Sequence, residues 1–361
     1  MKRIIQMGII SFLFFSKMVF ADELSDKLRE DLNSSLQDHS APGAVMLVAN
    51  DKIGVLTFAA GDSDIATHTP MKVTDTFRIA SMSKTFLAAA ILKLVDEKKI
   101  NLDDLAQKYL PNSVSIAKIP NGKEVTVRQL LQMRSGIPDY YLGDNYKALF
   151  AKNKNYIVKP AEAIAAVYGE KPLFSAGKKY HYSNTNYVLL QLILENVTQR
   201  SLAEAMNQLI IQPLHLTRTY VTEEKDFADS NFKRLTTHGY SYDDDSRFVD
   251  VTRKYDGNGL GDGAVVTDIT DLYHFLRALL QDKSILNADT LKQMMNFIDT
   301  YGLGIYVERV GGDNYYTHNG CASGYSGQYW VDDENDWVII LTNSDETQFL
   351  NELGDKVYQN F

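Results

Sequence analysis

A serine and a lysine three residues apart, Ser81 and Lys84, are the first side chains here whose types and spacing indicate chemistry. They stand where a short strand pattern turns into a helix pattern, so they lie one turn apart on the same helix face. A serine hydroxyl becomes a useful nucleophile when a neighbouring group takes its proton. A lysine can take it if burial and a helix N-terminus lower its pKa. Ser-x-x-Lys at a helix start is therefore a coherent acylation device.

Context separates this pair from other matches to the same spacing. Three further Ser-x-x-Lys matches lie in polar or turn-forming sequence, at Ser115/Lys118, Ser175/Lys178 and Ser230/Lys233. Of the four serines, Ser81 alone opens a long run with apolar residues at helical spacing. The alternative for Ser81 is a helix-capping serine beside a solvated lysine, and the motif by itself favours that alternative.

Two more polar patches extend the pattern. Residues 182–184 open a predicted helix, and residues 318–321 end a predicted strand near the C-terminus. Each side chain also has a plainer explanation: Tyr182 is one of 21 tyrosines, Asn184 would cap a helix, and His318 would be a strand-end histidine facing solvent. A catalytic thiol at Cys321 is a rival hypothesis, but this cysteine has neither a helix N-terminus nor an obvious base beside it.

The order of these motifs resembles that of the serine β-lactamase and penicillin-binding-protein superfamily. It is Ser-x-x-Lys from Ser81, then Tyr-x-Asn from Tyr182, then His-Asn-Gly from His318. Within that superfamily the chain is similar to the branch of class C β-lactamases, serine D-Ala-D-Ala carboxypeptidases and related esterases. The resemblance covers nearly the whole mature chain, and residues 130–139 and 263–272 also fit it.

The resemblance implies a role for each residue of the first two motifs. Ser81 would be the acylated nucleophile, and Lys84 would accept or relay its proton. Tyr182, with its pKa lowered by nearby cations, would act with Lys84 as general base and then protonate the leaving group. Asn184 would hold Lys84 and a substrate amide.

The third motif would form one wall of the cleft. His318 would line it and help to bind a substrate carboxylate, with Asn319 as the next polar contact. Gly320 would let substrate lie close to the strand, while the backbone N–H groups of Ser81 and Cys321 would form the oxyanion hole. Many β-lactamases have lysine where this chain has His318. A neutral imidazole holds a carboxylate less firmly than an ammonium, which argues against efficient β-lactam hydrolysis.

The strands and helices that must position these residues follow a pattern that predicts an α+β (α/β sandwich) fold. In this fold an antiparallel sheet is flanked by helices and interrupted by an all-helical subdomain. The middle of the chain is predicted to be helical, with strands and helices on both sides of it. These are a helix over 24–36, a hairpin over 44–60, strands near 303–310, 315–318, 326–331 and 337–342, and a helix over 346–358. We expect a sheet-plus-helix subdomain from 22–100 and 255–361 and a mainly helical one from 101–254. Residues 217–249 are predicted to be irregular.

A glycine-rich loop, residues 257–263, precedes a predicted helix over 268–281. The spacing of its glycines loosely fits a dinucleotide-binding fingerprint, but no buried strand ending in an acidic residue follows the helix. We therefore expect these glycines to let the backbone pass close to a cleft rather than to bind a nucleotide.

The N-terminus predicts a secretory signal peptide over residues 1–21. Lys2 and Arg3 precede a short apolar run, and the small residue Ala21 stands at a plausible cleavage point. The mature chain would begin at Asp22 in the periplasm or outside the cell. An uncleaved anchor is the alternative, although the apolar run is short for a transmembrane helix, and no later segment is apolar enough to span a membrane.

These features predict a secreted serine hydrolase with an acyl-enzyme at Ser81. D-Ala-D-Ala carboxypeptidase-like or D-amino-acid peptidase activity on a small-molecule or peptide substrate is the leading hypothesis. The alternatives are an esterase, a weak class C-like β-lactamase, or a non-catalytic protein that binds β-lactams or peptidoglycan peptides. One cysteine and seven scattered histidines indicate neither metal nor cofactor. A net charge of −9 without a basic patch argues against nucleic acid, and the oligomeric state stays open.

Overall fold

The computed structural model describes residues 22–39, 41–151, 153, 156–223, 226, 234–243, 245, 247–254 and 259–360. The predicted signal peptide lies outside the described residues, as do residues 257–258 of the glycine-rich loop. Among the helices that are described, none combines the length and the hydropathy needed to cross a bilayer.

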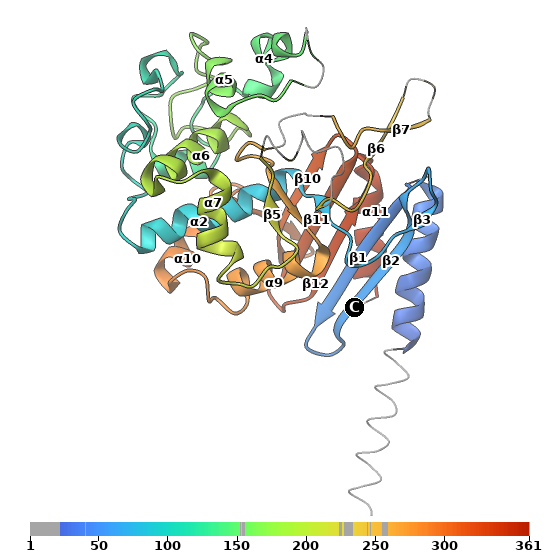
Figure 1. Cartoon of the computed structure of the whole chain (residues 1–361). Coiled ribbons are helices and arrows are strands. Elements are labelled where there is room, and N and C mark those ends of the chain that lie inside the picture. Colours follow the sequence, from blue (N-terminus) through green and yellow to red (C-terminus); the bar gives the residue numbers. More distant parts are fainter. Residues whose placement is uncertain are drawn as a thin grey trace, which may run out of the picture.

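A seven-stranded antiparallel sheet, with strand order β3-β2-β1-β12-β11-β10-β9, forms the centre of the fold (Figure 1). The two ends of the chain meet in its middle, where β1 pairs with β12 from Ala44↔Thr342 to Ala49↔Trp337. The predicted α+β fold is thereby confirmed. The strands are β1 (Gly43–Asn50), β2 (Gly54–Asp64), β3 (Thr69–Pro70), β9 (Tyr306–Val310), β10 (Asp313–Ala322), β11 (Tyr325–Asp332) and β12 (Trp337–Thr342).

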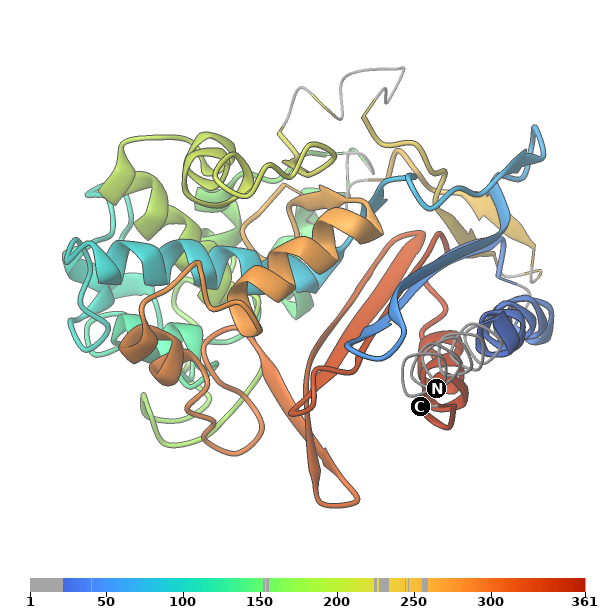
Figure 2. The same ribbon diagram turned by 90° about the horizontal axis from the view of Figure 1, so that it is seen from below.

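Helices cover both faces of this sheet (Figure 2). Successive side chains of a strand point to opposite faces. In β1, Val45 and Leu47 therefore pack into the larger core, while Met46 and Val48 pack into a second core. The second core lies under the predicted N-terminal helix, found at 22–38, and under α11. The larger core holds α2, α6 and α9.

The labelled helices lie between β3 and β9, except for α11, which follows β12. They are η1 (Ala80–Met82), α2 (Ser83–Asp96), η2 (Ala106–Lys108), η3 (Ile116–Lys118), α3 (Val127–Leu131), η4 (Tyr140–Leu142), α4 (Asp144–Leu149), α5 (Pro160–Ala165), α6 (Thr185–Thr198), α7 (Leu202–Met206), η5 (Asn207–Ile211), α9 (Ile269–Leu280), α10 (Ala288–Met294) and α11 (Gln348–Tyr358).

Residues 217–249 are not wholly irregular, so that prediction is wrong. They contain β5 (Tyr220–Val221), β6 (Tyr240–Tyr242) and most of β7 (Phe248–Asp250). β5 completes a small sheet of order β4-β8-β5 with β4 (Phe77–Arg78) and β8 (Val265–Thr267). Strands of two or three residues carry no period of their own, because their pairing comes from segments distant in sequence. The division at residues 100/101 and 254/255 stays a prediction.

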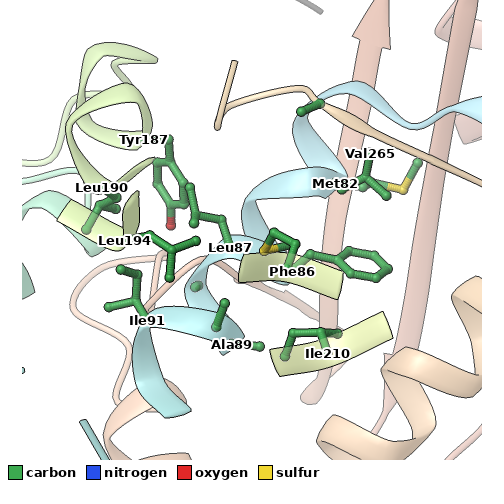
Figure 3. Packing of buried hydrophobic residues seen from close by; sticks show 14 of the residues in the cluster. Met82, Phe86, Leu87, Ala89, Ile91, Tyr187, Leu190, Leu194, Ile210 and Val265 are labelled. Atoms are coloured by element: carbon green, nitrogen blue, oxygen red, sulfur yellow. The ribbon is translucent and has the colours of Figure 1, made fainter. Parts of the chain in front are cut away.

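Helix α2 runs through the larger core and is apolar on nearly every side. Leu87 and Ile91 lie beside Leu190 and Leu194 of α6, while Phe86 points to another side of α2 and stacks on Phe275 of α9 (Figure 3). A helix that is apolar all round is a buried one. The predicted continuous helix from Ser81 is divided in the structure, because η1 covers Ala80–Met82 and α2 begins at Ser83.

Candidate active site

Ser81 lies in η1, the single turn of 3-10 helix that connects β4 to α2. The preceding residue, Ala80, has a φ angle of +44°, a left-handed value that non-glycine residues adopt rarely. This local strain turns the chain sharply out of the strand. Ser81 is left half-buried at the start of the buried helix α2.

Lys84 reaches back to Ser81 from the first turn of α2. Its Nζ lies 2.8 Å from Ser81 Oγ and 2.9 Å from the main-chain oxygen of Asp262. The side chain is fully buried, and this burial lowers the pKa of Lys84 from 10.5 to about 8. The carboxylates of Asp262 and Asp139 act in the opposite direction. A substantial fraction of Lys84 is therefore neutral at mildly alkaline pH, as a proton acceptor requires.

Tyr182 is the second polar group that contacts Ser81, and its hydroxyl donates to Ser81 Oγ at 2.9 Å. Lys84 Nζ lies 5.0 Å from the centre of the Tyr182 ring. Burial nevertheless raises the pKa of Tyr182 far above its usual value of 10, and the carboxylates of Asp262 and Asp139 raise it further. The prediction that cations lower this pKa is wrong, because desolvation penalises a phenolate more than the hydrogen bond to Ser81 stabilises it. Tyr182 is a neutral proton donor.

Asn184 belongs to the site through a different partner from the one expected. Its Nδ2 donates to Asp139 Oδ2 at 2.9 Å, whereas the hydrogen-bond acceptors of Lys84 in the described chain are Ser81 and Asp262. Asn184 occupies the position before α6, but its side chain makes no capping hydrogen bond there. The hydrogen bond of Asn184 is thus made to Asp139, and neither to Lys84, as predicted, nor to the start of α6, as a helix cap would require.

His318 is buried completely, so it neither faces solvent nor lines an open cleft. Its Nδ1 lies 2.7 Å from the main-chain oxygen of Asn319, and its Nε2 lies 3.2 Å from the Tyr301 hydroxyl. Since a carbonyl oxygen only accepts, Nδ1 carries the proton and Nε2 accepts from Tyr301. Burial lowers the pKa of His318 from 6.5 to about 3. A neutral, enclosed imidazole does not offer the carboxylate contact that the resemblance implied.

The end of β10 presents an open strand edge beside Ser81. β9 pairs with β10 only as far as Tyr306↔Thr317, and in the described part of the chain no other strand pairs with β10 on that side. A two-residue turn joins β10 to β11 after the pair Ala322↔Tyr325. In an antiparallel ladder the hydrogen-bonding direction alternates, so the N–H groups of Asn319 and Cys321 point to the open edge. Both residues are exposed.

Gly320 explains how η1 comes so close to this edge. A Cβ added to Gly320 would lie 2.2 Å from the carbonyl oxygen of Ile79 and 3.0 Å from the amide nitrogen of Ser81. Only a residue without a side chain fits there, so the main chain at Ser81 lies against β10 next to Cys321. The Cys321 sulfur instead lies 3.6 Å from the main-chain oxygen of Asp345.

Two polar residues of this centre, Asp139 and Asp262, were missed by the sequence analysis. Tyr140 is buried, and its hydroxyl donates to Asp262 Oδ2 at 3.0 Å. Asp262 lies in the glycine-rich loop, where Gly261 packs so tightly that an added Cβ would lie 2.7 Å from the main-chain oxygen of Tyr187. The loop does pass close to the centre. Asp262 could not be singled out from the sequence, because the residues that it contacts come from segments that are distant in the chain.

No cluster of three or more metal-ligating side chains occurs among the residues that the structure describes. The geometry is that of a buried lysine and a neutral tyrosine converging on one serine, beside the exposed end of strand β10. Such an arrangement can activate the serine, stabilise an oxyanion and deliver a proton.

Comparison with known proteins places this chain in a family. The family described as Beta-lactamase matches residues 24–358. D-aminopeptidase from Brucella anthropi is 27% identical over 302 residues, which cover 81% of this chain and 54% of that protein. Protein flp from Staphylococcus aureus (strain COL) is 31% identical over 203 residues, 56% of this chain and 38% of that protein.

The chain thus spans about half the length, or less, of these two curated relatives. Among solved structures, a D-stereospecific amidohydrolase from Streptomyces sp. superimposes with a TM-score of 0.77 at 28% identity. That similarity covers 91% of this chain and 97% of the other.

Proposed function

The chain belongs to the Beta-lactamase family, and we propose that it is a serine hydrolase that cleaves the amide bond on the carbonyl side of a D-amino acid. The observation that carries this proposal is the convergence of Lys84 Nζ and the Tyr182 hydroxyl on Ser81 Oγ, at 2.8 and 2.9 Å. Two similar proteins named D-aminopeptidase and D-stereospecific amidohydrolase support the substrate class.

Acylation begins when neutral Lys84 takes the proton of Ser81 Oγ. The oxygen attacks the substrate carbonyl carbon, and the C=O electron pair moves to oxygen to form a tetrahedral oxyanion. The N–H groups of Ser81 and Cys321 stabilise that oxyanion at the open edge of β10. The lysine becomes an ammonium at this point, and nearby carboxylates stabilise it.

The intermediate then collapses as the C–N bond breaks. The Tyr182 hydroxyl gives its proton to the departing nitrogen, and the Lys84 ammonium returns a proton to the phenol, so both groups end neutral. A water molecule next attacks the Ser81 ester while Lys84 again takes a proton. The C–Oγ bond breaks and Oγ recovers that proton, which releases the D-amino acid and regenerates the site.

The state of His318 favours an amide or peptide substrate over a carboxylate-anchored one. A D-Ala-D-Ala carboxypeptidase or a β-lactamase recognises a substrate with a free carboxylate near the bond that is cleaved. Here the third motif offers a buried, neutral imidazole, with a pKa of about 3, in place of a cation. We therefore place D-amino-acid amides and short D-peptides ahead of D-Ala-D-Ala peptides, simple esters and β-lactams.

We further propose that the enzyme works outside the cytoplasm. The charged, then apolar, then small-residue pattern of residues 1–21 supports export and cleavage before Asp22.

The direct test compares hydrolysis of D-phenylalanine amide, its L enantiomer, an acyl-D-Ala-D-Ala peptide, a chromogenic ester and a chromogenic cephalosporin. We expect the D-amide to be the best amide substrate. Ser81→Ala should lower every activity by at least about 10⁴-fold. Ser175→Ala is the matched control, because Ser175 has the same Ser-x-x-Lys spacing on an exposed turn, and it should have no effect. Full activity in Ser81→Ala would overturn the proposal.

A further inference from the structure

A third residue, Asp262, contacts Lys84 although it belongs to none of the three motifs. Its main-chain oxygen accepts the hydrogen bond from Lys84 Nζ at 2.9 Å. Its carboxyl group is buried at 8% exposure. One carboxyl oxygen, Oδ2, accepts from the Tyr140 hydroxyl at 3.0 Å, and the other, Oδ1, is buried and has no hydrogen-bond partner in the described structure.

A buried carboxylate with few hydrogen bonds is costly in free energy unless a nearby positive charge compensates for it. Burial raises the pKa of Asp262 to about 6, while the charge of Lys84 lowers it and so opposes protonation. The interaction is mutual, because the Asp262 carboxylate raises the pKa of Lys84. At neutral pH the carboxylate is therefore ionised, and it favours the ammonium form of Lys84.

We propose that Asp262 is a positioning residue of this hydrolase: its carbonyl oxygen holds Lys84 on Ser81, and its carboxylate, held by Tyr140, sets the pH at which Lys84 becomes a base. This inference rests on the proposed function, in which Lys84 is the proton acceptor. It gives a role in catalysis to a residue of the glycine-rich loop, whose glycines were expected only to let the backbone pass close to a cleft.

Other titratable groups around Lys84 come from four further segments. They are Asp139 before η4, Tyr182 before α6, Tyr187 within α6 and His318 on β10. The tyrosines and the histidine are neutral near pH 7, because burial raises the pKa of both tyrosines and lowers that of His318. Asp139 is the only other group here that raises the pKa of Lys84, and its effect is smaller than that of Asp262.

The test follows the rate of covalent labelling of Ser81 by a fluorophosphonate between about pH 5 and about pH 9.5, detected by intact mass. Asp262→Asn keeps the shape and leaves an amide oxygen to accept from Tyr140, but it removes the charge. Loss of an adjacent negative charge lowers a lysine pKa, so the acidic limb should move to lower pH by about one unit. At pH 6 the variant should then keep about tenfold more of its own plateau rate than wild type keeps.

Asp268→Asn is the matched control, since Asp268 is a buried carboxyl six residues further on that caps α9 through the Asp271 N–H. Its acidic limb should coincide with that of wild type. An unchanged limb in Asp262→Asn, or one moved to higher pH, would overturn the inference even if the plateau rate fell. If Asp262→Asn does not fold, Tyr140→Phe takes its place. Loss of its hydrogen bond raises the pKa of Asp262 and should move the limb the same way, by less.

The two proposals fail in different ways. Wild-type protein that is never labelled on Ser81 and hydrolyses none of the amide, ester or peptide substrates contradicts the hydrolase itself. Wild-type protein that is labelled with a clear acidic limb, which neither Asp262→Asn nor Tyr140→Phe moves, contradicts only the role of Asp262.

Discussion

Replacement of Gly320 by alanine tests whether close contact between η1 and β10 is needed for catalysis. The added Cβ would lie 2.2 Å from the Ile79 carbonyl oxygen and 3.0 Å from the Ser81 nitrogen. Both are main-chain atoms, so they cannot rotate away. Non-bonded heavy atoms are comfortable at roughly 3.5 Å, so η1 and β10 would have to separate by about 1 Å.

That separation moves the Ser81 N–H away from the Cys321 N–H. A displacement of about 1 Å at a catalytic group lowers the rate by roughly 10²-fold, and loss of one oxyanion donor has an effect of 10²–10³-fold, or about 3–4 kcal/mol in the barrier. We therefore expect kcat/KM of Gly320→Ala for the best amide or ester substrate to fall by about 10²-fold or more. The free energy of unfolding should fall by about 1–3 kcal/mol through overpacking.

Gly327→Ala provides the control, because Gly327 pairs with Gly320 across the β10–β11 hairpin. Its added Cβ would come nearest to Leu341 Cδ2 at 2.6 Å and Met82 Cε at 2.8 Å, which are ends of flexible side chains. Its nearest main-chain atom would be the Ile340 oxygen at 3.0 Å, whereas the nearest to a Gly320 Cβ would be at 2.2 Å. A similar loss of stability with at most about a fivefold loss of kcat/KM is expected for this variant. Equal losses in the two variants, or a Gly320→Ala enzyme within about threefold of wild type, would refute the reasoning.

Three further predictions use other parts of the structure. Tyr182→Phe removes the proton donor to the leaving group and should lower kcat for amides by about 10²–10⁴-fold. The loss of kcat should be smaller for an ester with a good leaving group. Equal losses for both substrates would argue against Tyr182 as the proton donor. His318→Gln should make the protein less sensitive to acid. The folded pKa of His318, about 3, lies below the unfolded value of 6.5, so the unfolded chain binds the extra proton. The free energy of unfolding of wild type therefore falls by up to about 1.4 kcal/mol per pH unit as pH drops below 6.5. Urea unfolding of both proteins between about pH 7 and about pH 4 measures the difference, and parallel curves would exclude the buried neutral histidine. Expressed with its leader, the protein should be recovered from the periplasm or medium with an N-terminal sequence that starts at Asp22, and an uncleaved leader would favour the anchor.

The sequence predicts the central sheet well where a segment contains its own pattern. The strand over residues 337–342 was predicted with the bounds that β12 has, because an apolar run lies between turn-forming residues. β10 was predicted to end at His318, but it continues to Ala322. Asn319 and Gly320 have little preference for strands, and their extended conformation is imposed by pairing with β11.

In the candidate site, likewise, the residues that belong to motifs could be predicted, whereas the properties that depend on packing could not. Ser81, Lys84 and Tyr182 could be selected from motif order, and the structure does bring them together. Their ionisation could not be predicted as well. Tyr182 was expected to have a lowered pKa, yet burial raises it, and burial depends on packing that no motif contains. The roles of Asp262 and Tyr140 depend on the same tertiary packing.

Burial changes the pKa values of the proposed base and acid in opposite directions, and this makes the pair usable. It lowers the pKa of Lys84 to about 8 and raises that of Tyr182, because desolvation penalises whichever form is charged. Ser81 therefore lies between an amine that can take a proton and a phenol that can give one. Water admitted to this centre would return the pKa of Lys84 towards 10.5 and leave it charged at neutral pH. The dryness that α2 and α6 impose by their packing is thus a catalytic property, although none of the residues that produce it belongs to a motif.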